Sequence, residues 1–392
     1  MTTLLLLIIY ISFISLGLPD SLLGSAWPVI QHEMGAPVSY AGMISMIIAG
    51  GTIVSSFYSE KIIRRLGTGL VTAISVFMTA AALIGFAVAP SILWMCVMAI
   101  PLGLGAGSVD AALNNFVALH YQAKHMNWLH CFWGVGATAG PAIMSIYLVQ
   151  DNNWQMGYMS IGIIQACLVV ILFLSLPLWK KFSSGAGAPQ ASTATPLKTS
   201  ELLKIRGLKP ALVAFFSYCA IEMTAGLWGS SYLVIHRGIS AETAAKWISV
   251  FYLGITLGRL LAGFVSSKLS NVSMVRVGIV GIGIGILLLL LPLGDVVYPI
   301  GFFMIGFGCA PIYPSMLHQT PQNFGSEMSQ SVMGLQMACA YIGSTLMPPL
   351  FGVIAQEISI AWFPFFLLAI LILMIVMSEI TNRAVARAPQ QQ

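Results

Sequence analysis

The chain has 392 residues, of which 58% are hydrophobic and only 7% are charged, and its formal net charge is +5. A soluble globular protein carries roughly a quarter charged residues, so this composition excludes a water-soluble domain and predicts a surface that mostly faces lipid. The 17 basic residues are scattered and form no stripe, which argues against a nucleic-acid-binding protein.

Twelve apolar stretches are long enough to cross a bilayer as helices, which takes about 20 residues for a hydrocarbon layer of about 30 Å. In chain order they are expected at residues 4–30, 40–58, 68–89, 91–119, 129–150, 157–179, 208–235, 243–267, 274–294, 296–318, 329–355 and 359–380. The first stretch has no basic segment before it and no small-residue cleavage site, so it is predicted to be a membrane helix and not a signal peptide. The expected fold class is all-α and integral to the membrane.

A polar segment rich in Ser, Ala, Gly and Pro separates the sixth and seventh stretches and is typical of a flexible linker. It divides the chain into an N-terminal six-helix bundle (1–180), a linker (181–207) and a C-terminal six-helix bundle with a short tail (208–392). Fourteen of the 17 basic residues fall on one side of the predicted membrane, Arg237 and Lys246 fall on the other, and one lies within a span. Because basic residues favour the cytoplasmic side, both termini and the linker are predicted to be cytoplasmic.

The second half of the chain echoes the first about 205 residues later. Three small-residue segments recur in the same order: GLGAG (103–107) with GFGCA (306–310), GATAGP (136–141) with GSTLMP (343–348), and GSAWPVI (24–30) with GSSYLVI (229–235). Such a repeat predicts two pseudo-symmetric bundles, with a binding site between them near the middle of the bilayer.

Five motifs resemble the major facilitator superfamily, and within it the branch of fucose/glucose/galactose–proton symporters. They are GLPDSLLG (17–24), GAGSVDAALNN (105–115), LHCFWGVGATAGP (129–141), GRLLAGF (258–264) and APIYPSMLHQTP (310–321). The resemblance implies that the spans carrying the first two motifs line a central cavity. The loop SEKIIRRLGTG (59–69) departs from the family pattern, because Arg64 stands where an acidic residue is expected, with Glu60 one turn earlier.

Four ionisable residues lie inside predicted spans, where charge is costly and a functional role is the default interpretation: Asp20, Asp110, Glu222 and Arg259. A carboxylate in a cavity can take up and release a proton near neutral pH, so the three acids are candidate proton-coupling groups. The resemblance implies that Asp20 and Asp110 are the coupling acids. Asp110 is predicted to be the main proton carrier, with Asp20 as its partner or as a hydroxyl-binding group. The alternative is that these carboxylates are structural, and that Glu222 pairs with Arg259.

The position of Arg259, near the cytoplasmic end of its span, suits a gate ion pair or a side chain that reaches the membrane interface. Sugars are bound by carboxylate, amide and aromatic groups. The candidate substrate-binding residues are therefore Asp20, Trp27, Asn114, His130, Trp133, Glu222, Trp228, Tyr313, Gln336 and Tyr341. Aromatic residues in a membrane bundle more often face lipid or the interface, and the sequence leaves the register of His130 against Trp133 open.

Together these features predict a secondary transporter that moves a small polar solute, a sugar in the first instance, by proton-coupled symport. A drug/proton antiporter of the same fold and a transporter-like receptor are the alternatives. No enzyme is expected, because no cofactor signature, phosphate-binding loop or metal-ligand spacing is found, and the six cysteines lie singly in apolar stretches. We expect no cofactor, with H⁺ or Na⁺ as the coupling ion, no nucleic-acid partner, a monomer, and insertion in a bacterial inner membrane.

Overall fold

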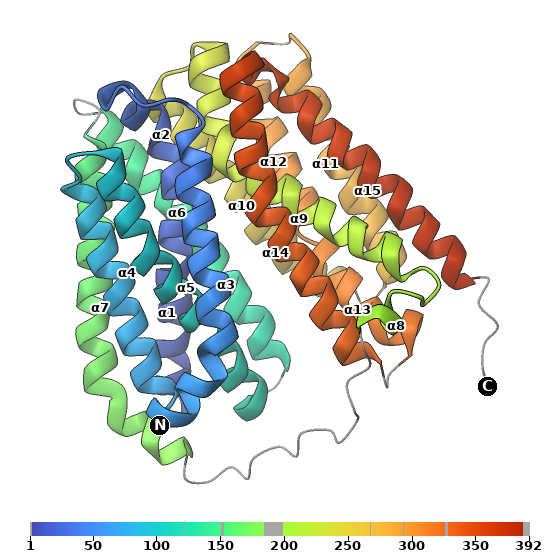
Figure 1. Ribbon diagram of the computed structural model, residues 1–392, viewed down its shortest axis with the longest axis horizontal. Coiled ribbons are helices and arrows are strands. Elements are labelled where there is room, and N and C mark those ends of the chain that lie inside the picture. Colours follow the sequence, from blue (N-terminus) through green and yellow to red (C-terminus); the bar gives the residue numbers. More distant parts are fainter. Residues whose placement is uncertain are drawn as a thin grey trace.

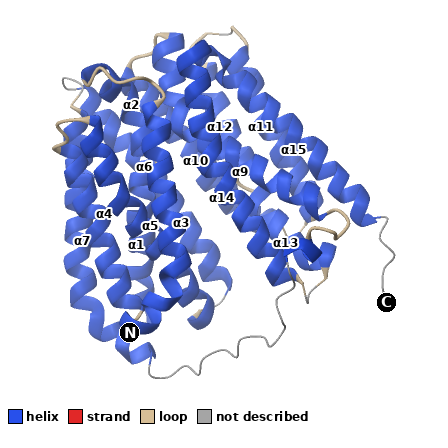
Figure 2. Cartoon of the chain, in the orientation of Figure 1, coloured by secondary structure: helices blue, strands red, loops and turns tan. Residues whose placement is uncertain are grey.

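The structure is a computed structural model. It describes residues 2–121, 123–149, 153–183, 199–266, 268–292, 294–325 and 328–386. All regular elements in these ranges are helices, and none is a strand (Figure 2). Most of the predicted linker, residues 184–198, lies outside the described ranges.

The first half of the chain forms six spans. These are α1 (Thr2–Asp20) with α2 (Leu22–Glu33), α3 (Tyr40–Leu66), α4 (Thr68–Ala87), α5 (Ile92–His120), α6 (Ala123–Val149) and α7 (Trp154–Ser183). A one-turn helix, α8 (Thr199–Leu202), follows in the residues predicted as linker. Its Leu202 is buried against Leu208 and Phe324, which explains why this end of the predicted linker is helical.

The second half forms six more spans. They are α9 (Leu208–Ser231) with the π-helical turn η1 (Tyr232–His236), α10 (Ala241–Val265), α11 (Asn271–Leu290), α12 (Val297–Cys309) with α13 (Ile312–Phe324), α14 (Ser329–Ile354), and α15 (Phe363–Ala386), which follows η2 (Ala355–Ser359) and η3 (Ile360–Trp362). Length and composition mark 11 membrane-crossing segments, of which the last, residues 331–386, is 56 residues long. That segment contains both α14 and α15, and a single crossing takes only about 20 residues. The twelve predicted crossings are therefore confirmed.

The spans form two bundles built on the same plan (Figure 1). In the first bundle α1 packs on α6, α3 on α5 and α4 on α7; in the second α9 packs on α14, α10 on α12 and α11 on α15. A Cβ atom added to Gly103 would lie 2.1 Å from the backbone oxygen of Ile48, and one added to Gly306 would lie 2.0 Å from that of Phe251. Gly306 follows Gly103 by the same number of residues as Phe251 follows Ile48, so the same helix crossing recurs in both bundles.

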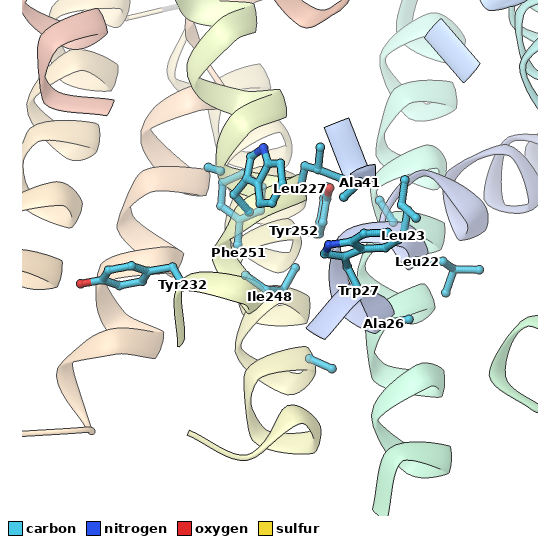
Figure 3. Packing of buried hydrophobic residues seen from close by; sticks show 14 of the residues in the cluster. Leu22, Leu23, Ala26, Trp27, Ala41, Leu227, Tyr232, Ile248, Phe251 and Tyr252 are labelled. Atoms are coloured by element: carbon cyan, nitrogen blue, oxygen red, sulfur yellow. The ribbon is translucent and has the colours of Figure 1, made fainter. Parts of the chain in front are cut away.

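The two bundles meet at one end and diverge at the other, where α1 begins and where α8 and α13 lie (Figure 1). At the closed end α2 packs on α9 without intervening side chains, because a Cβ added to Gly24 would lie 2.4 Å from the backbone oxygen of Gly226. The Ser230 hydroxyl donates across this contact to the Ser25 backbone oxygen at 3.3 Å. Residues of both bundles, Trp27 among them, share one hydrophobic core there (Figure 3).

Candidate functional site

The first span breaks at the residue that carries its charge. α1 ends at Asp20, Ser21 forms a turn, and α2 begins at Leu22. Pro19 lacks a backbone N–H and so removes one hydrogen bond from the helix just before the break. Asp20 is exposed although it lies near the middle of an otherwise apolar span. Tyr252 on α10 of the second bundle lies within electrostatic range of Asp20, which places the exposed carboxylate at the space between the bundles.

Asp20 is fixed by a neighbouring indole. The Nε1–H of Trp133 on α6 donates to Asp20 Oδ2 at 2.8 Å. The two helices approach closely beneath this bond, because a Cβ added to Gly17 would lie 2.1 Å from the Trp133 backbone oxygen. Gly17 lies three residues before Asp20 and so on the same face of α1. A small residue at this position lets the indole reach the carboxylate.

The ring of Trp133, whose N–H edge binds Asp20, carries a cation from the second bundle over its face. The Arg259 guanidinium on α10 lies 4.9 Å from the ring centroid, which is within the range of a cation–π contact. Arg259 Nη2 also lies 3.6 Å from Glu222 Oε1 on α9, and the two side chains are only 19% and 12% exposed. Glu222 in turn accepts a hydrogen bond from the Tyr218 hydroxyl one turn earlier.

Asp110 on α5 is held differently. Asn114 Nδ2, one turn on, donates to Asp110 Oδ1 at 2.8 Å. Asp110 lies within electrostatic range of Asp20 and also of Tyr313 and Tyr341, which belong to the second bundle. Among the residues that the structure describes, neither Asp110 nor Asp20 forms an ion pair.

The site thus combines three carboxylates and one guanidinium from four helices. Among the described residues Arg259 pairs with Glu222, whereas Asp20 and Asp110 each accept a hydrogen bond from a neutral group, an indole and an amide. Asp20 and Asp110 lie within electrostatic range of each other, so the two carboxylates repel each other when both are ionised. The arrangement can therefore accept protons, and it disfavours an anionic ligand.

The structure brings some of the other predicted site residues to this group. His130 is exposed, one turn before Trp133 on α6, and lies within electrostatic range of Arg259. Tyr313 and Tyr341 approach from the second bundle. Gln336 is buried, and its Oε1 already accepts a hydrogen bond from the Thr320 hydroxyl at 2.8 Å.

Trp27 and Trp228 lie elsewhere, in the closed end. Both are fully buried, and their indole N–H groups donate to the backbone oxygens of Val38 at 2.9 Å and Pro348 at 2.8 Å. Neither ring reaches the space beside Asp20 in this conformation. Both rings fill the contact between the bundles at the closed end.

Arg259 forms an ion pair, as one of its two predicted roles required, and its side chain does not reach the membrane interface. The sequence predicted a gate ion pair or a side chain that reaches the interface, and a gating role stays a prediction. In the structure the guanidinium points inward to Glu222 and Trp133, because a charge on that helix face finds both an anion and an aromatic ring there. The pairing with Glu222 that the sequence left as an alternative is present.

Two tyrosines of the site did not emerge from the sequence. Tyr218 lies four residues before Glu222, and this i, i+4 spacing was a signal for their contact. Tyr252 on α10 is nearly buried and lies within electrostatic range of both Asp20 and Glu222. Its place depends on how the two bundles meet, which no local pattern records.

Comparison with known proteins identifies the family of this sequence. The sequence model of the Major Facilitator Superfamily matches residues 9–343 and 210–389. The chain is 23% identical over 392 residues to "Bypass of stop codon protein 6" of Saccharomyces cerevisiae, covering 90% of this chain and 77% of the relative. It is 22% identical to the cis,cis-muconate transport protein of Acinetobacter baylyi (84% and 82% covered) and 26% identical to the glucose/mannose transporter GlcP of Bacillus subtilis (57% and 56% covered).

Solved structures share the fold. The nucleoside transporter NupG superposes with a TM-score of 0.79 at 15% identity, covering 97% of this chain and 99% of that one. The fucose:proton symporter FucP of E. coli superposes with a TM-score of 0.61 at 16% identity, covering 96% and 97%. The superpositions establish a shared architecture, and at identities this low they do not identify the solute.

Proposed function

Because the chain belongs to the Major Facilitator Superfamily and is a membrane transporter, we propose that it is a proton-coupled symporter for a small uncharged polyhydroxylated solute, a sugar in the first instance. The observation that carries the proposal is the pair of carboxylates, Asp20 and Asp110, which border the space between the bundles and form no ion pair among the residues that the structure describes. A proton is the smallest partner that neutralises such a group, and its uptake links the charge of the site to transport.

The charge of the site favours a neutral solute over an anion. With Glu222 paired to Arg259, the remaining carboxylates repel an anionic ligand. A sugar offers hydroxyl groups that both donate and accept hydrogen bonds, and an aromatic ring covers the apolar side of a pyranose. Asn114, His130 and Trp133 supply such groups next to the carboxylates.

The relatives support a polar solute without selecting one. Their names describe a glucose/mannose transporter, a hexuronate transporter, a cis,cis-muconate transport protein, a nucleoside transporter and a fucose:proton symporter. Three of these five solutes are sugars or sugar acids. The polar solute is therefore better supported than a hydrophobic cation.

We assign Asp110 as the main proton carrier and Asp20 as its partner. The open end of the structure is then the cytoplasmic end, because α1 begins there and the basic residues of the predicted cytoplasmic side belong to the same end of the spans. In this conformation solute and proton exchange with the cytoplasm. Alternating access would follow from closure of this end and opening of the end sealed by α2 and α9.

The test is proton movement in proteoliposomes that contain the purified protein and a pH-sensitive dye, with no pH gradient imposed. Hexoses, disaccharides, nucleosides and cationic drugs are added outside one at a time. Symport predicts internal acidification on addition of one sugar, lost in Asp110→Asn and retained in the control Asp295→Asn, which changes an exposed aspartate outside the spans.

Other outcomes would revise the proposal in different ways. Internal alkalinisation on addition of a drug would establish antiport and reject symport. Sugar uptake that follows a sodium gradient and leaves the internal pH unchanged would keep the solute but replace the coupling ion. Acidification that persists in Asp110→Asn would remove Asp110 from the proton path.

A further inference from the structure

Trp133 contacts a charged group of each bundle at the same time. Its indole N–H donates to Asp20 Oδ2 at 2.8 Å within the first bundle. Its ring face lies 4.9 Å from the guanidinium of Arg259, which belongs to the second bundle. It thus links a carboxylate that can be protonated to a cation across the surface along which the bundles must move.

The position of this ring is set by close helix packing on both sides. Gly17 of α1 fits against the Trp133 backbone oxygen, where an added Cβ would lie only 2.1 Å away. On the other side Gly134 fits against α10, where an added Cβ would lie 2.4 Å from the Thr256 hydroxyl oxygen. Thr256 is three residues before Arg259, so the same close approach places the guanidinium over the ring.

The two contacts of Trp133 depend on each other through the electrons of the indole. A hydrogen bond to an ionised carboxylate is stronger than one to a neutral acid. It draws the N–H proton towards the carboxylate and leaves more negative charge on the ring, since bonded groups polarise one another in a low-dielectric site. A more negative ring face attracts the guanidinium more strongly. Protonation of Asp20 reverses each step.

We propose that Trp133 is a positioning residue that couples the protonation of Asp20 to the contact between the bundles through Arg259. When Asp20 is ionised, Trp133 holds Arg259 and stabilises the conformation described here. When Asp20 is protonated, the hold weakens and the bundles separate more easily at their closed end. The inference rests on the proposed function in one respect, the protonation of Asp20 as the partner of Asp110.

Other ionisable groups lie near Asp20 and Arg259, so the test must separate their titration from the effect of the Trp133 N–H. Asp110 on α5 and Tyr252 on α10 lie within electrostatic range of Asp20, and His130 on α6 lies within range of Arg259. Glu222 and Tyr218 on α9 surround Arg259 from its own bundle. None of these groups forms a hydrogen bond with the indole in the part of the chain that the structure describes, so a change confined to the Trp133 N–H isolates its contribution.

The experiment measures amide hydrogen exchange of the purified full-length protein in nanodiscs between pH 5.5 and 8, corrected with an unstructured reference peptide. The reporter is the closed-end segment Leu22–Glu33, whose amides lose protection when the bundles separate there. Trp133→Phe keeps an aromatic face for Arg259 but removes the N–H donor. Asp20→Asn imitates the protonated acid, and Trp128→Phe, a 59% exposed tryptophan of the same helix, is the matched control.

We expect exchange of this segment in the wild type and in Trp128→Phe to be about fivefold faster at low pH than at high pH, the change that corresponds to one cation–π contact. Trp133→Phe and Asp20→Asn should exchange at the fast rate throughout. The double variant should match either single one, because both changes break the same link. A merely structural tryptophan would alter protection equally at every pH and would add to Asp20→Asn.

A Trp133→Phe protein with the wild-type pH response would overturn the inference. The dye assay on the same preparations separates its failure from that of the proposed function. If sugar-driven proton uptake needs Asp20 but exchange does not vary with pH, symport stands and the role of Trp133 falls. If no solute moves protons but exchange varies with pH as expected, proton symport falls and the role of Trp133 stands.

Discussion

Glu222 and Arg259 form a nearly buried ion pair, and such pairs depend on both partners. Removing one partner leaves an uncompensated charge in a low-dielectric interior, whereas removing both can be close to neutral. The i, i+4 pair of Glu242 and Lys246 lies on α10 with side chains that are 28% and 53% exposed, so it offers a solvated comparison.

Glu222→Gln should therefore lower the free energy of unfolding by about 2–4 kcal/mol. The double variant Glu222→Gln with Arg259→Leu should recover most of that loss. Glu242→Gln should cost less than about 1 kcal/mol, as for an exposed pair. Thermal unfolding of the purified proteins in detergent measures all three, and equal losses in Glu222→Gln and Glu242→Gln would contradict a buried pair.

At the scale of single residues, the sequence indicated which spans carry charged side chains but not which neighbouring helix each side chain faces. Asp20, Asp110, Glu222 and Arg259 were evident because charge inside an apolar span is rare and needs a reason. Trp27 and Trp228 were both predicted to bind the solute, and Trp228 was preferred because it shares a span with Glu222. Whether a tryptophan lines a cavity or seals a contact depends on which helix faces it, and that information is tertiary.

Among the helices, the extent of each span followed from the length of its apolar run, and the ends were less predictable. α13 extends to Phe324, beyond the predicted end at residue 318. The residues from His318 to Asn323 are polar, so hydropathy ends the span there while the backbone continues as a helix. Helix α6 likewise begins at Ala123, before its apolar stretch.

The crossings of α3 with α5 and of α10 with α12 each contain a glycine at the equivalent position, Gly103 in the first and Gly306 in the second. The Cβ of an alanine at Gly103 would clash with the backbone oxygen of Ile48, and the Cβ of an alanine at Gly306 would clash with that of Phe251. Gly103→Ala and Gly306→Ala should each cost about 1–3 kcal/mol in unfolding free energy, and by similar amounts. The control is Gly50→Ala on α3, where an added Cβ meets nothing within 4 Å. A large loss in the control, or a loss in only one of the pair, would argue against a shared packing plan.

For the whole molecule, the two-bundle plan was predictable because the repeat is visible in the sequence. Which end of the bundles is closed was not predicted, and in the proposed alternating-access cycle the same sequence must support closure at either end. The closed end is set by contacts between residues far apart in the chain, such as the Val38 backbone N–H and the Gln356 side chain at 2.9 Å.

The predicted orientation has a direct test in a bacterial host. Alkaline phosphatase, which is active only outside the cytoplasm, should be inactive when fused after Ala386 and active when inserted at Gly238, between η1 and α10. The physical reason is the excess of basic residues on the side that carries both termini. A green fluorescent protein fused at the same two positions should give the opposite pattern, and agreement of both reporters with the reverse orientation would reject it.

The charges of the central site also bear on how the membrane potential acts on the protein. Three carboxylates and one guanidinium leave two negative charges when all four are ionised. Moving one elementary charge across the membrane potential involves about 2.3 kcal/mol per 100 mV. If protons neutralise the loaded carrier, the voltage acts chiefly on the return of the empty one, and an interior-negative potential speeds that return. The electrical energy of the cell then enters the cycle in the step that carries no solute.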